Sequence, residues 1–309
     1  MQLTFKKIFT CILFFTFSIA SGQTVSQDKL LLHLEYLSSD ELKGRETLSE
    51  GNIEARKYLV NYFSSLGLES QYHNFQQKFS FENQRENKLY EDATNVVGFI
   101  AGSSSRKLIV ITAHYDHIGV GKKNNSGDSI YNGADDNASG TATLLALAEY
   151  FAKNRPGHSM IFAALDAEEM GLQGAKALVL DFPFALDQIL VNVNMDMVSR
   201  NDEGEIYASG THQNPNLKPM LEKASFGQTP KLMFGHDTPN TGSNNWTQSS
   251  DHGAFYDKGI PHIYFGVEDH KDYHKPSDEF KNIQPEFFYN AANLILKSIL
   301  ALDRELPKE

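Results

Sequence analysis

The feature of the sequence that most limits the possible folds is a regular alternation of strand-like and helix-like segments from residue 108 onward. Residues 108–112 form a continuous apolar, β-branched run, which is typical of a strand covered on both faces. The same reasoning predicts strands over 159–165, 189–195, 205–209 and 262–266, and helices over 139–151, 171–180 and 287–302. The alternation predicts an α/β fold, a single domain with a mostly parallel mixed central β-sheet sandwiched between helices.

Two further helices are expected before this alternation, and long loops are expected both before and within it. Helical periodicity marks residues 28–37 and 53–66. Two polar, turn-rich stretches, 72–92 and 121–133, are expected to be long surface loops. Together with 230–250, they are expected to shape any substrate cleft, since loops often carry function.

The N-terminus has the pattern of an export signal. A short basic region precedes an uncharged run over 8–20, and the small residues of 20–22 follow. The alternative is a membrane anchor, but 13 residues rise only about 20 Å as a helix, short of a hydrocarbon core of about 30 Å. We therefore expect residues 1–22 to be removed, leaving 23–309 as an exported domain, periplasmic or secreted, with no stable membrane anchor.

Composition excludes several classes of function. The net charge is −11 and no basic run occurs, so nucleic acid is not an expected partner. The one cysteine, Cys11, lies inside the predicted signal, which removes disulfides and cysteine catalysis from the mature chain. Nothing in the sequence favours one oligomeric state.

Potential metal ligands follow three of the predicted strands. His114 and Asp116 come after the first, Glu168 and Glu169 after the second, and Asp196 after the third. A single acid at a strand end usually caps the next helix. However, the carboxyl ends of parallel strands meet at one edge of the sheet, so these three groups are expected to converge.

The residue types suit a pair of cations. Residues i and i+2 of an extended chain share a face, so Asp116 can hold the far ring nitrogen of His114. Further ligands are offered by the loop 133–140, with Asp135 and Asp136, and by His270 and His274 after the last strand. Imidazoles with carboxylates match the ligands of zinc, and clustered carboxylates repel one another unless cations are present. Paired zinc ions about 3.5–4 Å apart are a recurrent device for hydrolysis.

On these motifs the sequence resembles the aminopeptidase Y and bacterial leucyl aminopeptidase family of co-catalytic zinc peptidases. The matching stretches run through nearly the whole mature chain: 37–45, 112–117, 133–140, 166–171, 194–196, 259–261 and 272–278. The resemblance implies two Zn²⁺ per chain, bridged by Asp136, with His114 and Asp196 on one ion and Glu169 and His274 on the other. It thereby favours Asp136 over Asp135 and His274 over His270, which spacing alone leaves open.

The resemblance also implies a reaction. The chain would be a zinc exopeptidase, most directly an aminopeptidase that hydrolyses N-terminal residues of peptides. Glu168 would act as general base and acid on a water held between the ions, and Asp116 would orient His114.

Four other readings compete with this one. A glutaminyl cyclase-like acyltransferase has the same fold but binds a single zinc. The related dizinc family of carboxypeptidases and deacylases carries a lid domain of about 100 residues, and only 77 residues separate Asp196 from His274. That length favours an aminopeptidase, while dipeptidase or carboxypeptidase specificity on the same fold stays open. A non-catalytic relative would have lost the ligand set. A serine hydrolase lacks support because no Gly-x-Ser-x-Gly elbow occurs and Ser139 is expected to cap the helix at 139–151.

Overall fold

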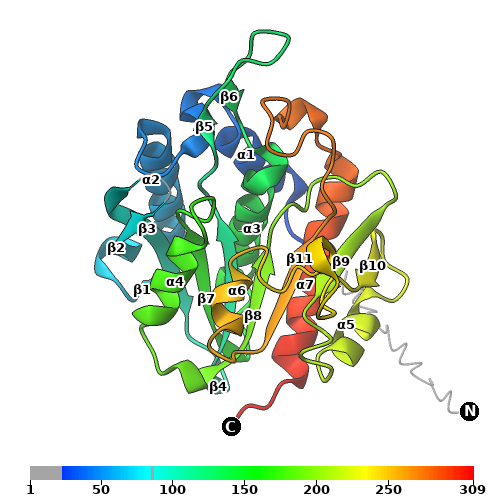
Figure 1. Cartoon of the computed structure of the whole chain (residues 1–309). Coiled ribbons are helices and arrows are strands. Elements are labelled where there is room, and N and C mark those ends of the chain that lie inside the picture. Colours follow the sequence, from blue (N-terminus) through cyan, green and yellow to red (C-terminus); the bar gives the residue numbers. More distant parts are fainter. Residues whose placement is uncertain (1–22, 85–86) are drawn as a thin grey trace, which may run out of the picture.

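A computed structural model describes residues 23–84 and 87–309 (Figure 1). The predicted export signal, 1–22, lies outside the described residues and stays a prediction. Within them, no helix combines the length and the apolar character that a membrane crossing requires.

One mixed sheet of nine strands runs through the described part of the chain, in the order β1-β3-β7-β4-β8-β11-β9-β10, with β2 paired to β3. The four central strands β7, β4, β8 and β11 are mutually parallel, while β3 and β9 run antiparallel to them. The strands are β1 (Glu69–Ser70), β2 (Gln76–Asn83), β3 (Lys88–Ile100), β4 (Ser105–His114), β7 (His158–Leu165), β8 (Ile189–Met195), β9 (Glu205–Ser209), β10 (Lys231–Phe234) and β11 (His262–Gly266).

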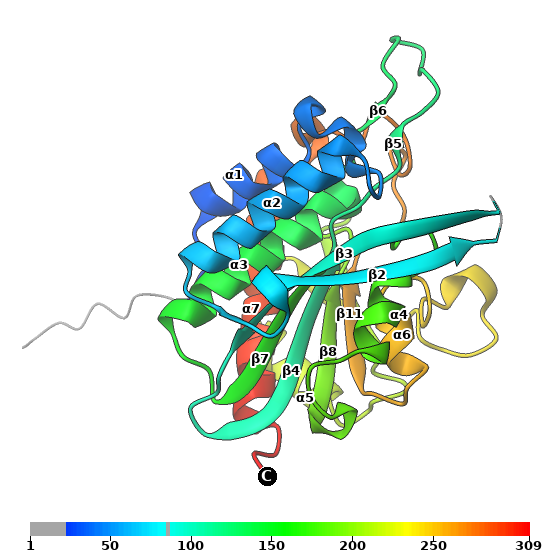
Figure 2. The same ribbon diagram turned by 90° about the vertical axis from the view of Figure 1, so that its left-hand side faces the viewer.

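Helices cover both faces of this sheet. Figure 2 shows α1, α2, α3 and α7 on one side of the strands and α4 and α6 on the other, while α5 packs against α7. The helices are α1 (Gln27–Leu37), α2 (Glu50–Ser65), α3 (Gly140–Lys153), α4 (Gln173–Leu180), α5 (Lys218–Ser225), α6 (His252–Tyr256) and α7 (Pro285–Glu305). The predicted α/β fold with a mixed, helix-covered sheet is confirmed.

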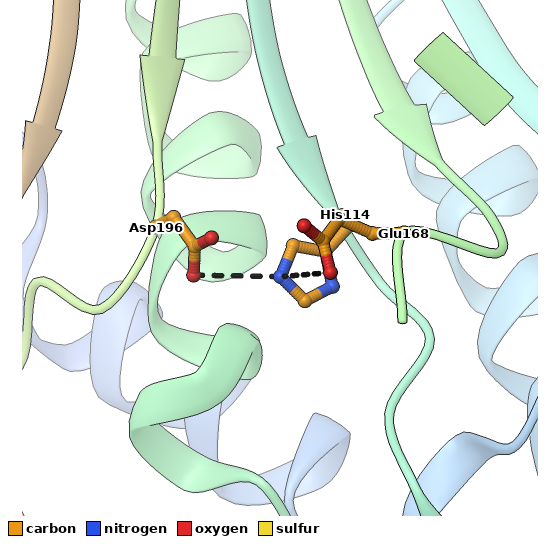
Figure 3. A group of neighbouring side chains, drawn as sticks. All are labelled: His114, Glu168 and Asp196. Carbon is orange, nitrogen blue, oxygen red and sulfur yellow. Dashed lines mark ion pairs between the residues drawn. The ribbon is translucent and has the colours of Figure 1, made fainter. Parts of the chain in front are cut away.

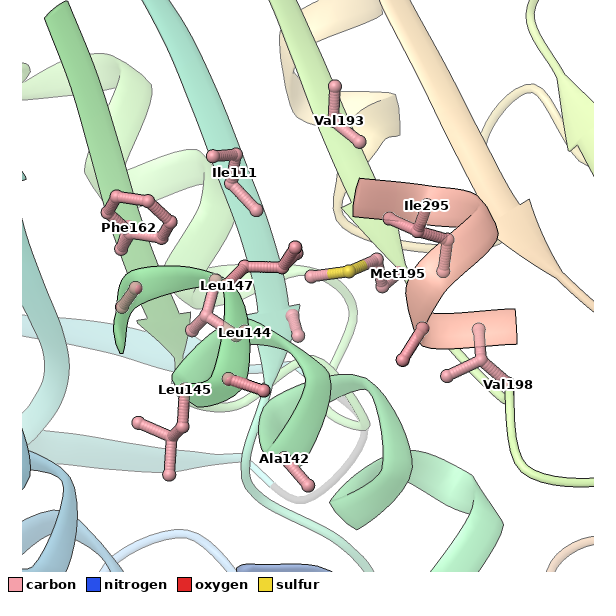
Figure 4. Close-up of a cluster of buried hydrophobic side chains, with 14 of the residues drawn as sticks. Ile111, Ala142, Leu144, Leu145, Leu147, Phe162, Val193, Met195, Val198 and Ile295 are labelled. Atoms are coloured by element: carbon pink, nitrogen blue, oxygen red, sulfur yellow. The ribbon is translucent and has the colours of Figure 1, made fainter. Parts of the chain in front are cut away.

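The apolar run in β4 has a direct structural explanation. Ile109 and Ile111 pack into the large core under α3 and α7, whereas Leu108 and Val110 pack into a second core under α4 and α6. Figure 4 shows Ile111 of β4 beside the leucines of α3. Burying each such side chain stabilises the fold by about 1.5–3 kcal/mol. The buried core thus fixes β4 and its neighbours, and with them the sheet edge where polar residues follow.

The expectation of a surface loop over 72–92 is wrong. Strands β2 and β3 form a long antiparallel hairpin there, with Phe81 opposite Tyr90 and their rings stacked 5.1 Å apart. The hairpin projects beyond the helices (Figure 2), and β2 alternates between buried and solvated positions. Such a half-solvated arm is polar in composition, which made it look like a loop.

Two other stretches differ in part from expectation. The loop predicted over 121–133 holds for most of its length, because only β5 (Gly119–Val120) and β6 (Ile130–Tyr131) pair at its ends. By contrast, α5, β10 and α6 were not predicted.

Candidate active site

The carboxyl ends of the central strands bring the predicted site residues together. His114 is the last residue of β4, Asp196 follows β8, and Glu168 and Glu169 follow β7. Figure 3 shows His114 joined by ion pairs to the carboxylates of Asp196 and Glu168. The side chains of these four residues are mostly or wholly buried. The side chain of His274, the remaining predicted histidine ligand, is 38% exposed at the mouth of the site.

One group of potential ligand atoms gathers at His114. Its Nε2 lies 3.4 Å from Asp136 Oδ1 and 3.4 Å from Asp196 Oδ1. Tetrahedral bonds of 2.0–2.2 Å place neighbouring ligand atoms about 3.3 Å apart. Both distances from His114 Nε2 are therefore those expected between neighbouring ligands of one zinc ion.

A second group gathers at His274. Its Nε2 lies 3.0 Å from Asp136 Oδ2 and 3.4 Å from Glu169 Oε2. Asp136 therefore turns one carboxylate oxygen to each group. The structure thus brings all five predicted ligands together, in two groups that share Asp136.

The alternatives Asp135 and His270 lie together but outside both groups. His270 Nε2 is 3.1 Å from Asp135 Oδ2, and Asp135 Oδ1 accepts hydrogen bonds from the Ser199 N–H and hydroxyl, both at 2.7 Å. These contacts occupy the Asp135 carboxylate. Asp136 and His274 are left facing the cluster.

Asp116 has a broader role in the geometry than expected. Its carboxylate lies 3.6 Å from His114 Nδ1, and its main-chain carbonyl is closer, at 3.2 Å. The carboxylate also accepts hydrogen bonds from the N–H groups of Glu168 (3.1 Å) and Glu169 (3.3 Å). Asp116 thus contacts both His114 and the loop that carries the two glutamates, as an orienting residue would.

Ser139 stands at the N-cap position of α3, as expected, but its side chain does not cap the helix. The Ser139 hydroxyl donates to the Asp135 carbonyl and makes no capping bond. Instead Asn137 Oδ1 accepts from the Gly140 N–H at 2.9 Å, three residues on. A Cβ at Gly140 would lie 2.3 Å from that oxygen, so only glycine fits there.

Arg45 holds the main chain beneath the site. Its guanidinium is fully buried and donates to the carbonyls of Tyr115 (2.8 Å), Asn132 (2.7 Å), Gly133 (3.0 Å) and Leu37. Burial lowers the pKa of Arg45 to about 10, so it stays charged at neutral pH. The rigid fork of five N–H donors allows one side chain to fix the segments that carry both His114 and Asp136.

The polar atoms of the site fit bound cations. Four buried atoms aimed into it have no hydrogen-bond partner: His114 Nε2, His117 Nδ1, Glu169 Oε1 and Asp196 Oδ1. Leaving a buried polar atom unpaired costs about 1–3 kcal/mol. In addition, each ion-pair partner found for Asp136, Glu168, Glu169 and Asp196 within the described chain is a histidine. A cluster this acidic and this poor in hydrogen bonds is suited to metal ions.

The titration of the site residues reflects the same crowding. Burial alone lowers the pKa of His114, but the Asp196 and Glu168 carboxylates outweigh it, and the net pKa lies well above the ordinary value. Burial, reinforced by Asp196 and Asp251, raises the pKa of Glu168 well above its usual range. The crowding of carboxylates thus raises both pKa values, and metal binding to such groups releases protons.

Two cavities meet at this cluster. The outer one has a volume of about 990 Å³ and runs between the tip of the β2–β3 hairpin and the start of α4. The inner one, of about 200 Å³, is lined by aromatic residues that include Trp246, Tyr264 and Tyr273. Glu168 and His274 line both cavities and so stand at their junction.

The loops expected to shape the cleft do so unequally. Residues 82–84, from the first, line the outer cavity, and Ser243, Trp246 and Ser249, from 230–250, line the inner one. Residues 121–133 line neither cavity.

Three residues of the site were not predicted. His117, 1% exposed, lies among the second group of ligand atoms. Tyr264 donates its hydroxyl to the Asp196 carbonyl at 3.2 Å, and Tyr273 lines the same inner cavity. The sequence signal for His117 was its place three residues after His114, and for Tyr273 its place directly before His274.

Comparison with known proteins places the chain among peptidases. The model of peptidase family M28 matches residues 95–299. The chain is 28% identical over 207 residues to the "Probable zinc metalloprotease" of Pyrenophora tritici-repentis, covering 58% of this chain and 47% of that protein. It is 27% identical over 201 residues to aminopeptidase YwaD of Bacillus subtilis, covering 62% and 40%. The chain thus matches less than half the length of these two relatives.

Solved structures share its fold at low sequence identity. BSAP, a zinc aminopeptidase from Bacillus subtilis, aligns with a TM-score of 0.71 and 16% identity over 89% of this chain and 94% of its own. The glutaminyl cyclase of Porphyromonas gingivalis aligns with a TM-score of 0.73 and 16% identity over 89% and 98%. The structures of both enzymes therefore resemble this chain about equally well, and the family assignment rests on the sequence match. Because that match extends over more than half of its residues, the chain belongs to peptidase family M28.

Proposed function

We propose that this chain is an aminopeptidase that binds two Zn²⁺ ions and removes N-terminal residues from peptides. The first ion would be held by His114, Asp136 and Asp196, and the second by Asp136, Glu169 and His274. The sharing of Asp136, with one oxygen toward each histidine, supports two ions and not one.

The residues that line the two cavities favour an aminopeptidase over a carboxypeptidase or a dipeptidase. Both cavities contain several carboxylates, and among their described lining residues none is Lys or Arg. A carboxypeptidase or dipeptidase needs a cation to pair with the free carboxylate of its substrate. A substrate ammonium group, in contrast, is attracted to such a lining, and Asp269 adds a further carboxylate to the inner cavity.

The positions of the cavities suggest how a peptide would lie. The inner cavity, of about 200 Å³, has aromatic rings in its lining, and its size suits a single side chain. The outer cavity, of about 990 Å³, suits the rest of the peptide. The scissile bond would then lie at their junction, beside Glu168.

The chemistry follows from this placement. When bound, a pair of divalent cations supplies Lewis-acid activation of water and of the scissile carbonyl. Glu168 would accept a proton from the attacking water and later deliver it to the leaving amine. The Glu168 side chain lies within 4.0 Å of His114 Nε2, close to the proposed ions.

Tyr273 is the tyrosine that we assign to the developing negative charge on the carbonyl oxygen. The Tyr264 hydroxyl is already bonded to the Asp196 carbonyl. The Tyr273 hydroxyl has no partner among the described residues and belongs to the same cavity. It is therefore the hydroxyl that is free to donate.

Replacing Tyr273 by Phe is expected to lower kcat by about 10²-fold with little change in KM, because the lost bond forms mainly in the transition state. Steady-state kinetics at fixed zinc measure this. Tyr264→Phe is the matched control and should retain more activity. Unchanged kcat in Tyr273→Phe would refute the assignment.

A glutaminyl cyclase remains the alternative, because that enzyme type shares the fold. The two groups of ligand atoms argue against it, since the resemblance implies a single zinc for the cyclases. The substrates themselves separate these possibilities.

The test is a panel of substrates with and without a metal chelator. We expect rapid release of the first residue from aminoacyl chromogenic substrates and peptides, and loss of that activity in chelator with recovery on added Zn²⁺. N-acetylated versions of the same substrates should react at least 100-fold more slowly. Faster cleavage of the blocked substrates, or conversion of glutaminyl peptides with loss of ammonia and no cleavage, would overturn the proposal.

A further inference from the structure

His117 belongs to the buried floor of the site but has no role in the proposed chemistry. It is 1% exposed, and its Nδ1 lies 2.8 Å from Glu169 Oε1 and 3.7 Å from Asp136 Oδ2. The ring is held in place from behind, because a Cβ at Gly133 would lie 2.5 Å from His117 Cδ2. The His274 ring meets it edge to face, with centroids 5.8 Å apart.

The short contact with Glu169 does not have the alignment of a hydrogen bond. Although the two atoms are 2.8 Å apart, both His117 Nδ1 and Glu169 Oε1 lack a hydrogen-bond partner, as does His117 Nε2. An imidazole that merely positioned Glu169 would align its N–H with the carboxylate. Both atoms are therefore left without a partner and close enough together to share one.

Asp136 is part of the same arrangement. Potential ligand atoms of His117, Asp136 and Glu169 all lie within 4.8 Å of one another, and two of these residues are already proposed ligands of the second ion. An imidazole nitrogen is a preferred zinc ligand.

We propose that His117 Nδ1 is a fourth protein ligand of the second ion. The inference rests on the two-ion site of the proposed function. With it, the two ions become unlike. The second ion has four protein ligands, as in closed zinc sites, while the first has three and keeps a position open. The second ion should therefore bind more tightly and fill first, and water and substrate should approach the first.

The measurement is the number of imidazoles bound to zinc, determined by X-ray absorption on metal-free protein given one equivalent of Zn²⁺. Two imidazoles per ion are expected in the unmodified chain and one in His117→Gln. Competition with a chromophoric chelator should show that His117→Gln weakens the tighter site more than 100-fold, beyond the 10–100-fold typical of a residue outside the ligand set. His73→Gln, an exposed histidine, is the matched control and should change neither value.

A single imidazole bound to zinc in the unmodified chain would overturn the proposal. This measurement does not depend on whether the His117→Gln variant folds. An unchanged affinity in His117→Gln would also overturn it. The outcomes separate this inference from the proposed function. Two imidazoles on a chain that hydrolyses no aminoacyl substrate would support His117 as a ligand and refute the aminopeptidase. A chain that binds no zinc would refute both.

Discussion

Replacing Glu168 by Gln is expected to lower kcat about 10²–10⁴-fold while the protein keeps the two zinc ions of the proposed site. The amide cannot accept the proton of the attacking water, but it preserves the size of the side chain. Among the described lining residues, Glu168 is the only carboxylate that lines both cavities, so no second carboxylate is placed to replace it as the base. Turnover of an aminoacyl substrate and zinc content of the purified variant are the two measurements.

The paired measurement matters because Glu168 lies close enough to His114 and Asp196 to be a ligand itself. If Glu168→Gln lost zinc, the residue would be a ligand and not the base. If it kept zinc and full turnover, the base would have to be sought elsewhere. Glu82→Gln is the matched control, because Glu82 lines the outer cavity but not the inner one, and it should leave kcat unchanged.

Replacing Asp136 by Asn is expected to abolish activity by removing metal from both sites. The carboxylate turns one oxygen to each group, and an amide offers one oxygen and no charge. We expect less than one zinc per chain after dialysis. An ion present at 100 times its Kd stabilises a protein by about 2.7 kcal/mol, so the melting temperature of the variant should no longer respond to added Zn²⁺.

Asp269→Asn is the control for this experiment. Asp269 lines the inner cavity but belongs to neither group of ligand atoms, so its variant should keep two zinc ions and a melting temperature that depends on them. Two tightly bound zinc ions in Asp136→Asn would contradict the bridging geometry.

Much of the fold was predictable because burial on both faces leaves a clear signal. The strands β8, β9 and β11 have the bounds expected from their apolar runs. The helix α7 is three residues longer at its C-terminal end than its periodicity predicts, since helix ends carry little sequence signal. Where a segment is short or half-solvated, that signal fades. The hairpin of β2 and β3 was missed for this reason, although Phe79 and Phe81 recur two residues apart on it.

For the candidate site, the sequence predicted which residues come close together better than it predicted the contacts that each of them makes. Polar residues at the ends of β4, β7 and β8 had to meet, because the central strands are parallel. The separation of Asp136 from Asp135 needed the structure, since only there is Asp135 seen to bond with Ser199 and His270. The roles of these residues as ligands, base and orienting group stay predictions.

The hydrogen bonds of Arg45 show that the candidate site depends on residues that precede the stretch matched by the family model. The stretch that matches the family model starts at residue 95, within β3. Arg45 lies 50 positions earlier and supplies donors to carbonyls on either side of that boundary, at Leu37 and at Tyr115, Asn132 and Gly133. A protein shortened to the matching stretch would lose those donors. The N-terminal segment that contains Arg45 is therefore needed to hold the segments of the candidate site in place, and a shortened protein should include it.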